Sequence, residues 1–214
     1  LLVPAGDYEA EARVLEDLSE LPEVDCAVGV GSGDDIVDVV LEALNQGPKK
    51  AWFKEREANC LTGDRVLLTD PWCAYLRIAE GCDNHCAYCV IPSLRGKYRS
   101  RPMNELLDEA ADLASSGVKE LLVIAQDITR YGIDLYGKYS LAELLRKITD
   151  ATSIPWIRLL YCYPDKITDE LIAEIRDNPR VVKYIDIPIQ HISDNMLTAM
   201  NRHGDSAMIR ETVA

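Results

Sequence analysis

Apolar strands alternate with amphipathic helices from residue 74 to the end of the chain, and this alternation limits the possible folds more than any other feature. The strand candidates are residues 75–78, 120–125, 156–160 and 184–189, and helical periodicity lies between them at residues 102–116, 140–148 and from 168 onward. Strands separated by helices of this length form βαβ units with right-handed crossovers, which give a parallel sheet with helices packed outside it. The chain is therefore predicted to be an α/β protein. An open twisted sheet and an incomplete barrel both satisfy this pattern.

A smaller α/β segment precedes this region. Residues 8–18 have helical periodicity, residues 24–30 form a short apolar run, and residues 36–44 are periodic again. We expect Ser32 to cap the last of these helices, because a serine side chain accepts hydrogen bonds from free N–H groups at a helix start.

A stretch of mixed charge and no sustained period separates the two α/β regions. It covers residues 49–70, and we expect one or two short strands within it, near residues 66–68. The predicted organisation is an N-terminal α/β fragment at 1–47, a linker at 48–72 and a core domain at 73–214.

The composition limits where the protein acts and what it binds. The 214 residues are 48% hydrophobic and carry a formal net charge of −13. No apolar run reaches the roughly 20 residues that span a bilayer, so we expect a cytoplasmic protein without a membrane partner. The acidic charge repels a phosphate backbone, which disfavours nucleic acid as the primary partner. Seven cysteines, an odd number with uneven spacing, do not resemble the framework of a secreted disulfide protein.

Three of the seven cysteines lie within eight residues. Residues 81–89 read GCDNHCAYC, so Cys82, Cys86 and Cys89 form a CxxxCxxC arrangement directly after the first strand of the repeating region. Cysteine thiolates are the usual ligands of iron–sulfur clusters, and a loop this short can wrap one cluster without distant parts of the chain. We therefore predict that these three cysteines are metal ligands of a [4Fe-4S] cluster.

Three protein ligands leave one iron of such a cluster open to a small molecule. S-adenosylmethionine (SAM) has an amine and a carboxylate suited to that position, and an electron from the reduced cluster can break its carbon–sulfur bond, so SAM is the expected second cofactor. Two alternatives remain at this point. A structural zinc site would need four ligands, with His85 as the fourth, and an electron-transfer iron–sulfur module would need a further nearby cysteine, which the loop lacks.

The cysteine loop and three later segments together resemble the radical SAM methylthiotransferase family. These segments are residues 77–102 (RIAEGCDNHCAYCVIPSLRGKYRSRP), 122–132 (LVIAQDITRYG), 158–164 (RLLYCYP) and 186–202 (DIPIQHISDNMLTAMNR). The resemblance covers about residue 73 to the end, and it is greatest to the branch called RimO, which modifies an aspartate on the twelfth protein of the small ribosomal subunit. The sister branch called MiaB, which modifies tRNA, typically reads Ser-Gly-Ser-Asp where this chain has residues 191–194.

The resemblance implies an incomplete parallel β/α barrel of the radical SAM type, with four of its six strands in this chain and the cluster at the mouth. In parallel α/β folds, residues at the carboxyl ends of strands face the active site. Gln126, Asp127 and Gln190 occupy such positions and are predicted cofactor-binding residues, and Tyr88 resembles the family's adenine-side residue. No catalytic residue beyond the cluster ligands is predicted. The four basic residues between positions 95 and 101 could balance the cluster's charge or form a solvated loop.

The resemblance also implies a function. A RimO-type enzyme is a transferase that adds a methylthio group to the β-carbon of an aspartate on a small-subunit ribosomal protein, with electrons from a donor such as flavodoxin or ferredoxin. The family holds a second [4Fe-4S] cluster on three cysteines of its N-terminal domain. We expect those cysteines and a β-rich C-terminal domain to lie outside this chain, which we interpret as truncated at both ends. A tRNA methylthiotransferase is the alternative enzyme, and a structural zinc or electron-transfer module is the alternative of another class.

Overall fold

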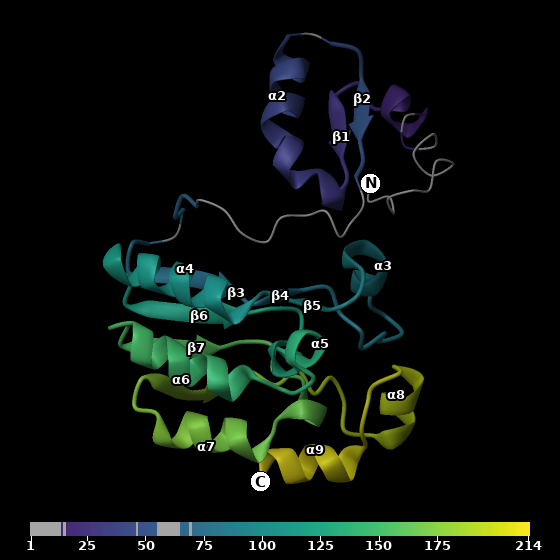
Figure 1. The fold of residues 1–214 in the computed structure, drawn as a ribbon. Helices are drawn as coiled ribbons and strands as arrows, with labels where there is room; N and C mark the ends of the chain where they lie inside the picture. Colours follow the sequence, from purple (N-terminus) through teal and green to yellow (C-terminus); the bar gives the residue numbers. More distant parts are fainter. Residues whose placement is uncertain (1–13, 15, 46, 55–64, 69) are drawn as a thin grey trace. The chain divides into compact units, whose positions relative to one another are not determined.

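The computed structural model of the chain describes residues 14, 16–45, 47–54, 65–68 and 70–214. These residues fall into two compact units (Figure 1). The smaller unit contains Leu1–Gly63 and Val90–Gly96, and the larger contains Asp64–Cys89 and Lys97–Ala214.

The smaller unit is built on a pair of short parallel strands, β1 (Cys26–Val28) and β2 (Lys50–Trp52). A 3₁₀ turn at Val30–Asp35 leads from β1 into helix α2 (Ile36–Leu44), and α3 (Ile91–Arg95) groups with this unit. Residues 16–20 are helical, as predicted, whereas residues 8–13 and 15 of that predicted helix lie outside the described residues.

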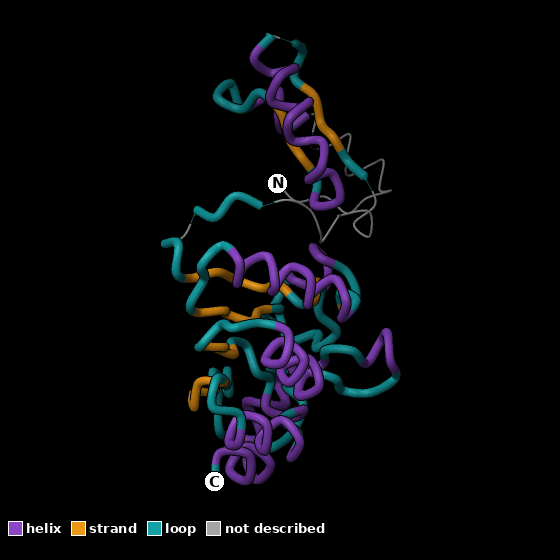
Figure 2. Tube along the Cα trace, turned by 60° about the vertical axis from the view of Figure 1, so that its left-hand side comes forward, coloured by secondary structure: helices purple, strands orange, loops and turns teal. Residues whose placement is uncertain are grey.

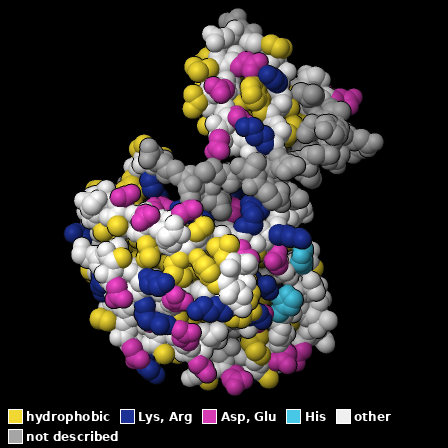
Figure 3. Space-filling view, in the orientation of Figure 1, with side chains coloured by type: hydrophobic (Ala, Val, Ile, Leu, Met, Phe, Trp, Pro, Cys, Tyr) yellow, Lys and Arg dark blue, Asp and Glu magenta, His cyan; other side chains and the backbone are white. Residues whose placement is uncertain are grey.

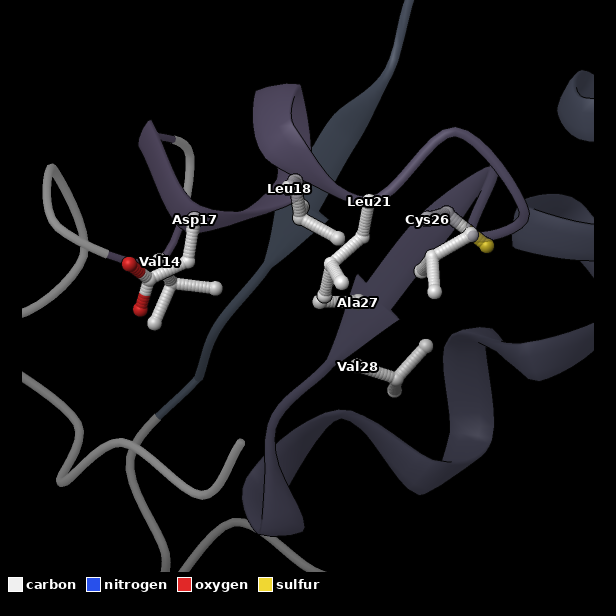
Figure 4. A pocket seen from close by; sticks show the side chains of 8 residues that line it. Val14, Asp17, Leu18, Leu21, Cys26, Ala27 and Val28 are labelled. Carbon is white, nitrogen blue, oxygen red and sulfur yellow. The ribbon is translucent and has the colours of Figure 1, made fainter.

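A pocket of about 230 Å³ lies between the helical turn at residues 16–20 and strand β1 (Figure 4). It is lined mainly by apolar side chains, namely Val14, Leu18, Leu21, Val24, Ala27 and Val28, together with Asp17 and Cys26. None of the predicted site residues lines it.

Two local predictions for this part of the chain are wrong. Ser32 does not cap α2, because it sits inside the 3₁₀ turn with its hydroxyl buried and without a hydrogen-bond partner. Residues 66–68 do not form a strand, and the strand that the structure describes between residues 49 and 70 is β2. The side chains of Val66 and Leu68 are 85% and 95% exposed, so no neighbouring strand covers them, whereas β2 has β1 as its partner.

The larger unit contains a parallel sheet of four strands, which confirms the predicted α/β fold. In the part of the chain that the structure describes, the strand order is β3 (Cys73–Arg77), β6 (Glu120–Ile124), β7 (Trp156–Leu159) and β8 (Val181–Ile185). Each neighbouring pair is parallel, and the order follows the chain, as in an incomplete β/α barrel.

Three helices cover one face of this sheet (Figure 2). They are α4 (Met103–Ser115), α6 (Leu141–Ala151) and α7 (Asp169–Asp177), and each faces the sheet with its apolar side. Alternate residues of β3 and β6 are fully buried beneath them, among them Leu76 and Leu121. Burial of this apolar layer is the main stabilising contribution to the unit.

The starts of α7 and α6 differ in their side-chain hydrogen bonds. The helix predicted from residue 168 onward is α7, and the Thr168 hydroxyl caps it by accepting a hydrogen bond from the Leu171 N–H at 3.2 Å. Residues 140–143 read SLAE, a pattern that favours a capping box at the start of α6, but the box is not formed. The Ser140 hydroxyl donates instead to the Lys138 carbonyl, and Glu143 pairs with lysine side chains.

The remaining elements lie in the connections. An antiparallel pair, β4 (Ala79–Glu80) and β5 (Arg99–Ser100), flanks the cysteine loop and α3, and α5 (Ile133–Tyr136) follows β6. Helices α8 (Asp194–Ala199) and α9 (Ser206–Val213) follow β8.

Strand β8 ends earlier than predicted, at Ile185 rather than at residue 189. Beyond Asp186 the backbone makes short local hydrogen bonds, such as that from the Ile189 N–H to the Ile187 carbonyl, and so leaves the sheet. Every helix in the described ranges is too short or too polar to cross a bilayer.

Candidate functional site

The three clustered cysteines lie in a loop, residues 81–89, that follows β3 and β4. Gly81 opens the loop with a φ of 77°, a conformation that favours glycine, and a turn closes it through a hydrogen bond from the Cys89 N–H to the Cys86 carbonyl at 2.9 Å. Cys82 is buried, whereas Cys86 and Cys89 are partly exposed. Burial raises the pKa of the Cys82 thiol, the Asn84 N–H opposes that shift, and the neighbouring thiols of Cys86 and Cys89 add to it.

The thiols of Cys86 and Cys89 are therefore close enough to Cys82 to change its pKa. Among the described residues, no group of three or more His, Cys, Asp or Glu side chains is arranged to hold one metal ion. A four-iron cluster is larger than an ion and takes cysteine thiolates as its usual ligands, so three thiols of one loop can bind it without a fourth protein ligand, which a structural zinc site needs.

Seven buried side-chain polar atoms of the described residues have no hydrogen-bond partner, and one of them is Oδ1 of Asn84, inside the loop. Another is Oε1 of Gln126, which follows β6 and Ala125 and precedes Asp127. A buried acceptor without a donor costs free energy, and in native proteins it commonly marks a place where a further group binds. The donor set and the free acceptors thus fit a cluster with a polar small molecule beside it.

Asp127 connects strand β6 to the cysteine loop. Its carboxylate is fully buried and accepts hydrogen bonds from Asn84 Nδ2 at 3.0 Å and from the Thr129 N–H at 3.0 Å. The Thr129 hydroxyl and the Arg130 side chain also contact it, at 2.5 Å and 3.4 Å. Burial raises the pKa of this carboxyl, and its hydrogen bonds oppose that shift. These protein donors engage both carboxylate oxygens, and a contact between Asp127 and SAM remains a prediction.

Tyr88 and Gln190 are more exposed than Asp127. Tyr88 lies within the cysteine loop, and Gln190 lies in the segment after β8. The Tyr88 ring is 56% exposed, and its phenol interacts with Cys86 and Arg202. Partial burial raises the pKa of that phenol, while the charge of Arg202 lowers it. Gln190 is exposed after β8, with a φ of 64°. Their contacts with a cofactor also remain predictions.

Four described residues other than glycine have a positive φ, namely His85, Tyr161, Gln190 and Asn201. His85 lies in the cysteine loop, and the other three follow β7, β8 and α8. Such conformations cost free energy and persist where the surroundings fix them, and they often cluster at functional sites. Tyr161 and Gln190 lie beyond the carboxyl ends of β7 and β8, the edge at which parallel α/β folds commonly place their sites.

Sequence reasoning missed two side chains that contact Cys86. Arg202 lies with Nη1 3.6 Å from Cys86 Sγ, and Tyr163 interacts with the same thiol. Both belong to segments that carry the family resemblance, 158–164 and 186–202, which is the signal that could have identified them.

The basic residues between positions 95 and 101 do not act as one solvated group. Arg101 is only 3% exposed, pairs with Glu109 at 2.6 Å and donates to the Arg77 carbonyl at 2.9 Å. On the face shown in Figure 3, basic side chains are scattered among acidic ones.

A parallel β/α sheet with three clustered cysteines after its first strand defines the class of protein. Residues 76–214 match the radical SAM superfamily, and the chain belongs to that superfamily. It is 47% identical over 202 residues to the ribosomal protein uS12 methylthiotransferase RimO of Clostridium tetani, an alignment that covers 94% of this chain and 46% of the relative. It is 50% identical over 202 residues to the RimO of Caldanaerobacter subterraneus subsp. tengcongensis, with 93% of this chain and 46% of the relative covered. The chain thus spans about half the length of the curated relatives it matches.

Solved structures resemble the fold at low sequence identity. The radical SAM methyltransferase TsrM from Kitasatospora setae matches with a TM-score of 0.63 and 12% identity over 99% of this chain and 53% of that one. The cobalamin-dependent radical SAM enzyme OxsB matches with a TM-score of 0.53 and 11% identity over 100% of this chain and 38% of that one. At these identities the likeness shows the fold alone.

Proposed function

We propose that this chain is part of a radical SAM methylthiotransferase of the RimO type, which adds a methylthio group to the β-carbon of an aspartate on a small-subunit ribosomal protein. The observation that carries the proposal is the loop with Cys82, Cys86 and Cys89, set in a chain 47–50% identical to RimO proteins over more than nine-tenths of its length.

The three loop cysteines are the proposed ligands of a [4Fe-4S] cluster, which leaves one iron for SAM. When bound, the cluster supplies the electron that cleaves SAM reductively. The chain holds and orients the pair: the loop fixes the thiols, and the carboxyl ends of the strands surround the place where SAM binds.

Gln126 is the proposed hydrogen-bond acceptor for SAM, which its buried and unpartnered Oε1 supports. Tyr88, beside Cys86, and Gln190, after β8, are the other proposed contacts. Asp127 is a further proposed contact, and its carboxylate also accepts hydrogen bonds from Asn84 of the cysteine loop and from Thr129.

For the whole protein we propose the organisation that the family resemblance implies. Residues 1–47 are the C-terminal part of the methylthiotransferase N-terminal domain, residues 48–72 the linker and residues 73–214 the radical SAM core. Within the proposed linker, β2 pairs with β1. A second [4Fe-4S] cluster belongs to the full-length protein, and flavodoxin or ferredoxin is the proposed class of electron donor.

SAM cleavage is tested by anaerobic reconstitution of the whole protein with iron and sulfide, followed by dithionite and SAM. Production of 5'-deoxyadenosine is expected from the wild type and from Cys73→Ala, which changes a cysteine of β3 outside the loop. Cys86→Ala should abolish it. A wild type that binds zinc tightly at the loop, or forms no four-iron spectrum, would contradict the proposal.

The substrate is tested separately with the same reconstituted protein. The ribosomal protein and bulk tRNA are each incubated with it, and each is then examined by mass spectrometry for an added methylthio group. A mass gain on the ribosomal protein supports the proposal, whereas a gain on tRNA alone would assign the chain to the sister branch.

A further inference from the structure

Three consecutive residues after α8 lie against the middle of the cysteine loop, although they follow it by more than 110 positions in the sequence. The Met200 carbonyl accepts a hydrogen bond from the Ala87 N–H at 2.9 Å, and Asn201 Nδ2 donates to the His85 carbonyl at 2.8 Å. Arg202 completes the set with Nη1 at 3.6 Å from Cys86 Sγ. We call residues 200–202 the clasp.

Arg202 is itself held in place from several sides. Its guanidinium lies over the Tyr163 ring, 4.0 Å from the ring centre, and also donates to the Pro188 carbonyl. The backbone N–H of Arg202 donates to the Leu197 carbonyl of α8 at 2.9 Å. A planar guanidinium can make these contacts at once, whereas a lysine ammonium has neither the fork nor the flat face.

We propose that Arg202 is a positioning residue that fixes the Cys86 sulfur and stabilises its negative charge, so that it raises the reduction potential of the cluster. This inference rests on the proposed [4Fe-4S] cluster. On this proposal, the segment after α8 helps the cluster to accept an electron.

The physical reason is electrostatic. Reduction adds one negative charge to the cluster and its thiolates, and a cation close to one thiolate favours the more negative state. Net charge and hydrogen bonds to the ligand sulfurs are among the factors that set the potential of iron–sulfur clusters. Arg202 is half-buried, so solvent screens its charge less than that of an arginine on the open surface.

The potential of the cluster near the loop is measured by an EPR-monitored redox titration of the reconstituted whole protein. For Arg202→Gln we expect at least about a tenfold fall in the ratio of reduced to oxidised cluster at a fixed potential, a shift of about 59 mV to more negative values for one electron. Arg202→Lys should fall between this variant and the wild type. Arg210→Gln, which removes an exposed charge from α9, is the matched control and should titrate as the wild type does.

A second measurement needs no cluster. In the apo protein, Asn201→Ala should speed hydrogen exchange of the Ala87 amide, because the clasp no longer holds the loop. This readout tests the clasp, and the Arg202→Lys titration keeps the role of Arg202 testable if Arg202→Gln does not fold.

The outcomes separate this inference from the proposed function. A wild type that forms no cluster overturns both. A wild type with a normal cluster, combined with an Arg202→Gln potential equal to that of Arg210→Gln, overturns the role of Arg202 alone. Unchanged Ala87 exchange in Asn201→Ala overturns the clasp.

Discussion

Replacing Asp127 with alanine should strongly destabilise the larger unit. Asp127 is fully buried, and its loss removes the acceptor of three buried donors, namely Asn84 Nδ2, the Thr129 N–H and the Thr129 hydroxyl. Each unsatisfied buried group costs about 1–3 kcal/mol, and Arg130 also loses its carboxylate partner. We therefore expect a loss of about 4 kcal/mol, a large share of the roughly 5–15 kcal/mol that stabilises a typical domain.

Urea unfolding followed by far-UV circular dichroism measures this loss. With a slope of about 2 kcal/mol per molar urea, the midpoint should fall by about 2 M. The matched control is Asp177→Ala, which removes an exposed carboxylate paired with Arg176 and should leave the midpoint unchanged. If Asp127→Ala unfolds within about 0.3 M of the wild type, the reasoning that buried donors depend on this carboxylate is wrong.

Three further predictions concern other parts of the larger unit. Leu145→Ala removes a fully buried side chain of α6 and should cost about 2–5 kcal/mol in the same urea assay, and a loss below about 1 kcal/mol would contradict the packing. Burial raises the pKa of Cys162 to about 12, so iodoacetamide at pH 8 should label this thiol only in urea, and mass spectrometry would detect labelling of the native protein as a contradiction. Hydrogen bonds from Lys138 and Lys147 lower the pKa of Glu143 to about 2. The charged carboxylate therefore stabilises the folded state above pH 4.5, and this contribution disappears as the pH falls toward 2. Glu143→Gln should accordingly be less stable than the wild type at pH 7 and equally stable near pH 2. The Glu143 side chain is partly exposed and its Lys138 partner is exposed, so solvent screens the pair and this difference should stay below about 1 kcal/mol. Unfolding midpoints of both proteins at pH 7 and pH 2 measure it.

The sequence predicts the α/β fold well because hydrophobic periodicity is a local property of helices and strands. Strands β3, β6 and β7 lie where apolar runs predict them. Side-chain caps are less predictable, since a hydroxyl has several possible partners. Thr168 caps its helix, whereas Ser140 bonds to a nearby carbonyl and Ser32 is buried in a turn.

The candidate site was only partly predictable for a related reason. The three cysteines lie within one loop, so the sequence alone is enough to propose them as cluster ligands. The contact between Arg202 and Cys86 joins residues 116 positions apart, and no periodicity encodes it. Asp127 was predicted to be a cofactor-binding residue from its place after a strand. Only the structure shows that its carboxylate accepts a hydrogen bond from the Asn84 side chain.

The residues between the first two cysteines are held by three different parts of the larger unit. The Asp83 carboxylate accepts from the Tyr98 N–H at 3.0 Å, Asn84 donates to Asp127, and the His85 carbonyl accepts from Asn201. A short loop tied at successive residues cannot rearrange without breaking several hydrogen bonds at once, so the surrounding elements set the positions of its thiols. Ligand geometry in this protein should therefore be sensitive to substitutions in β6 and after α8 that leave every cysteine intact.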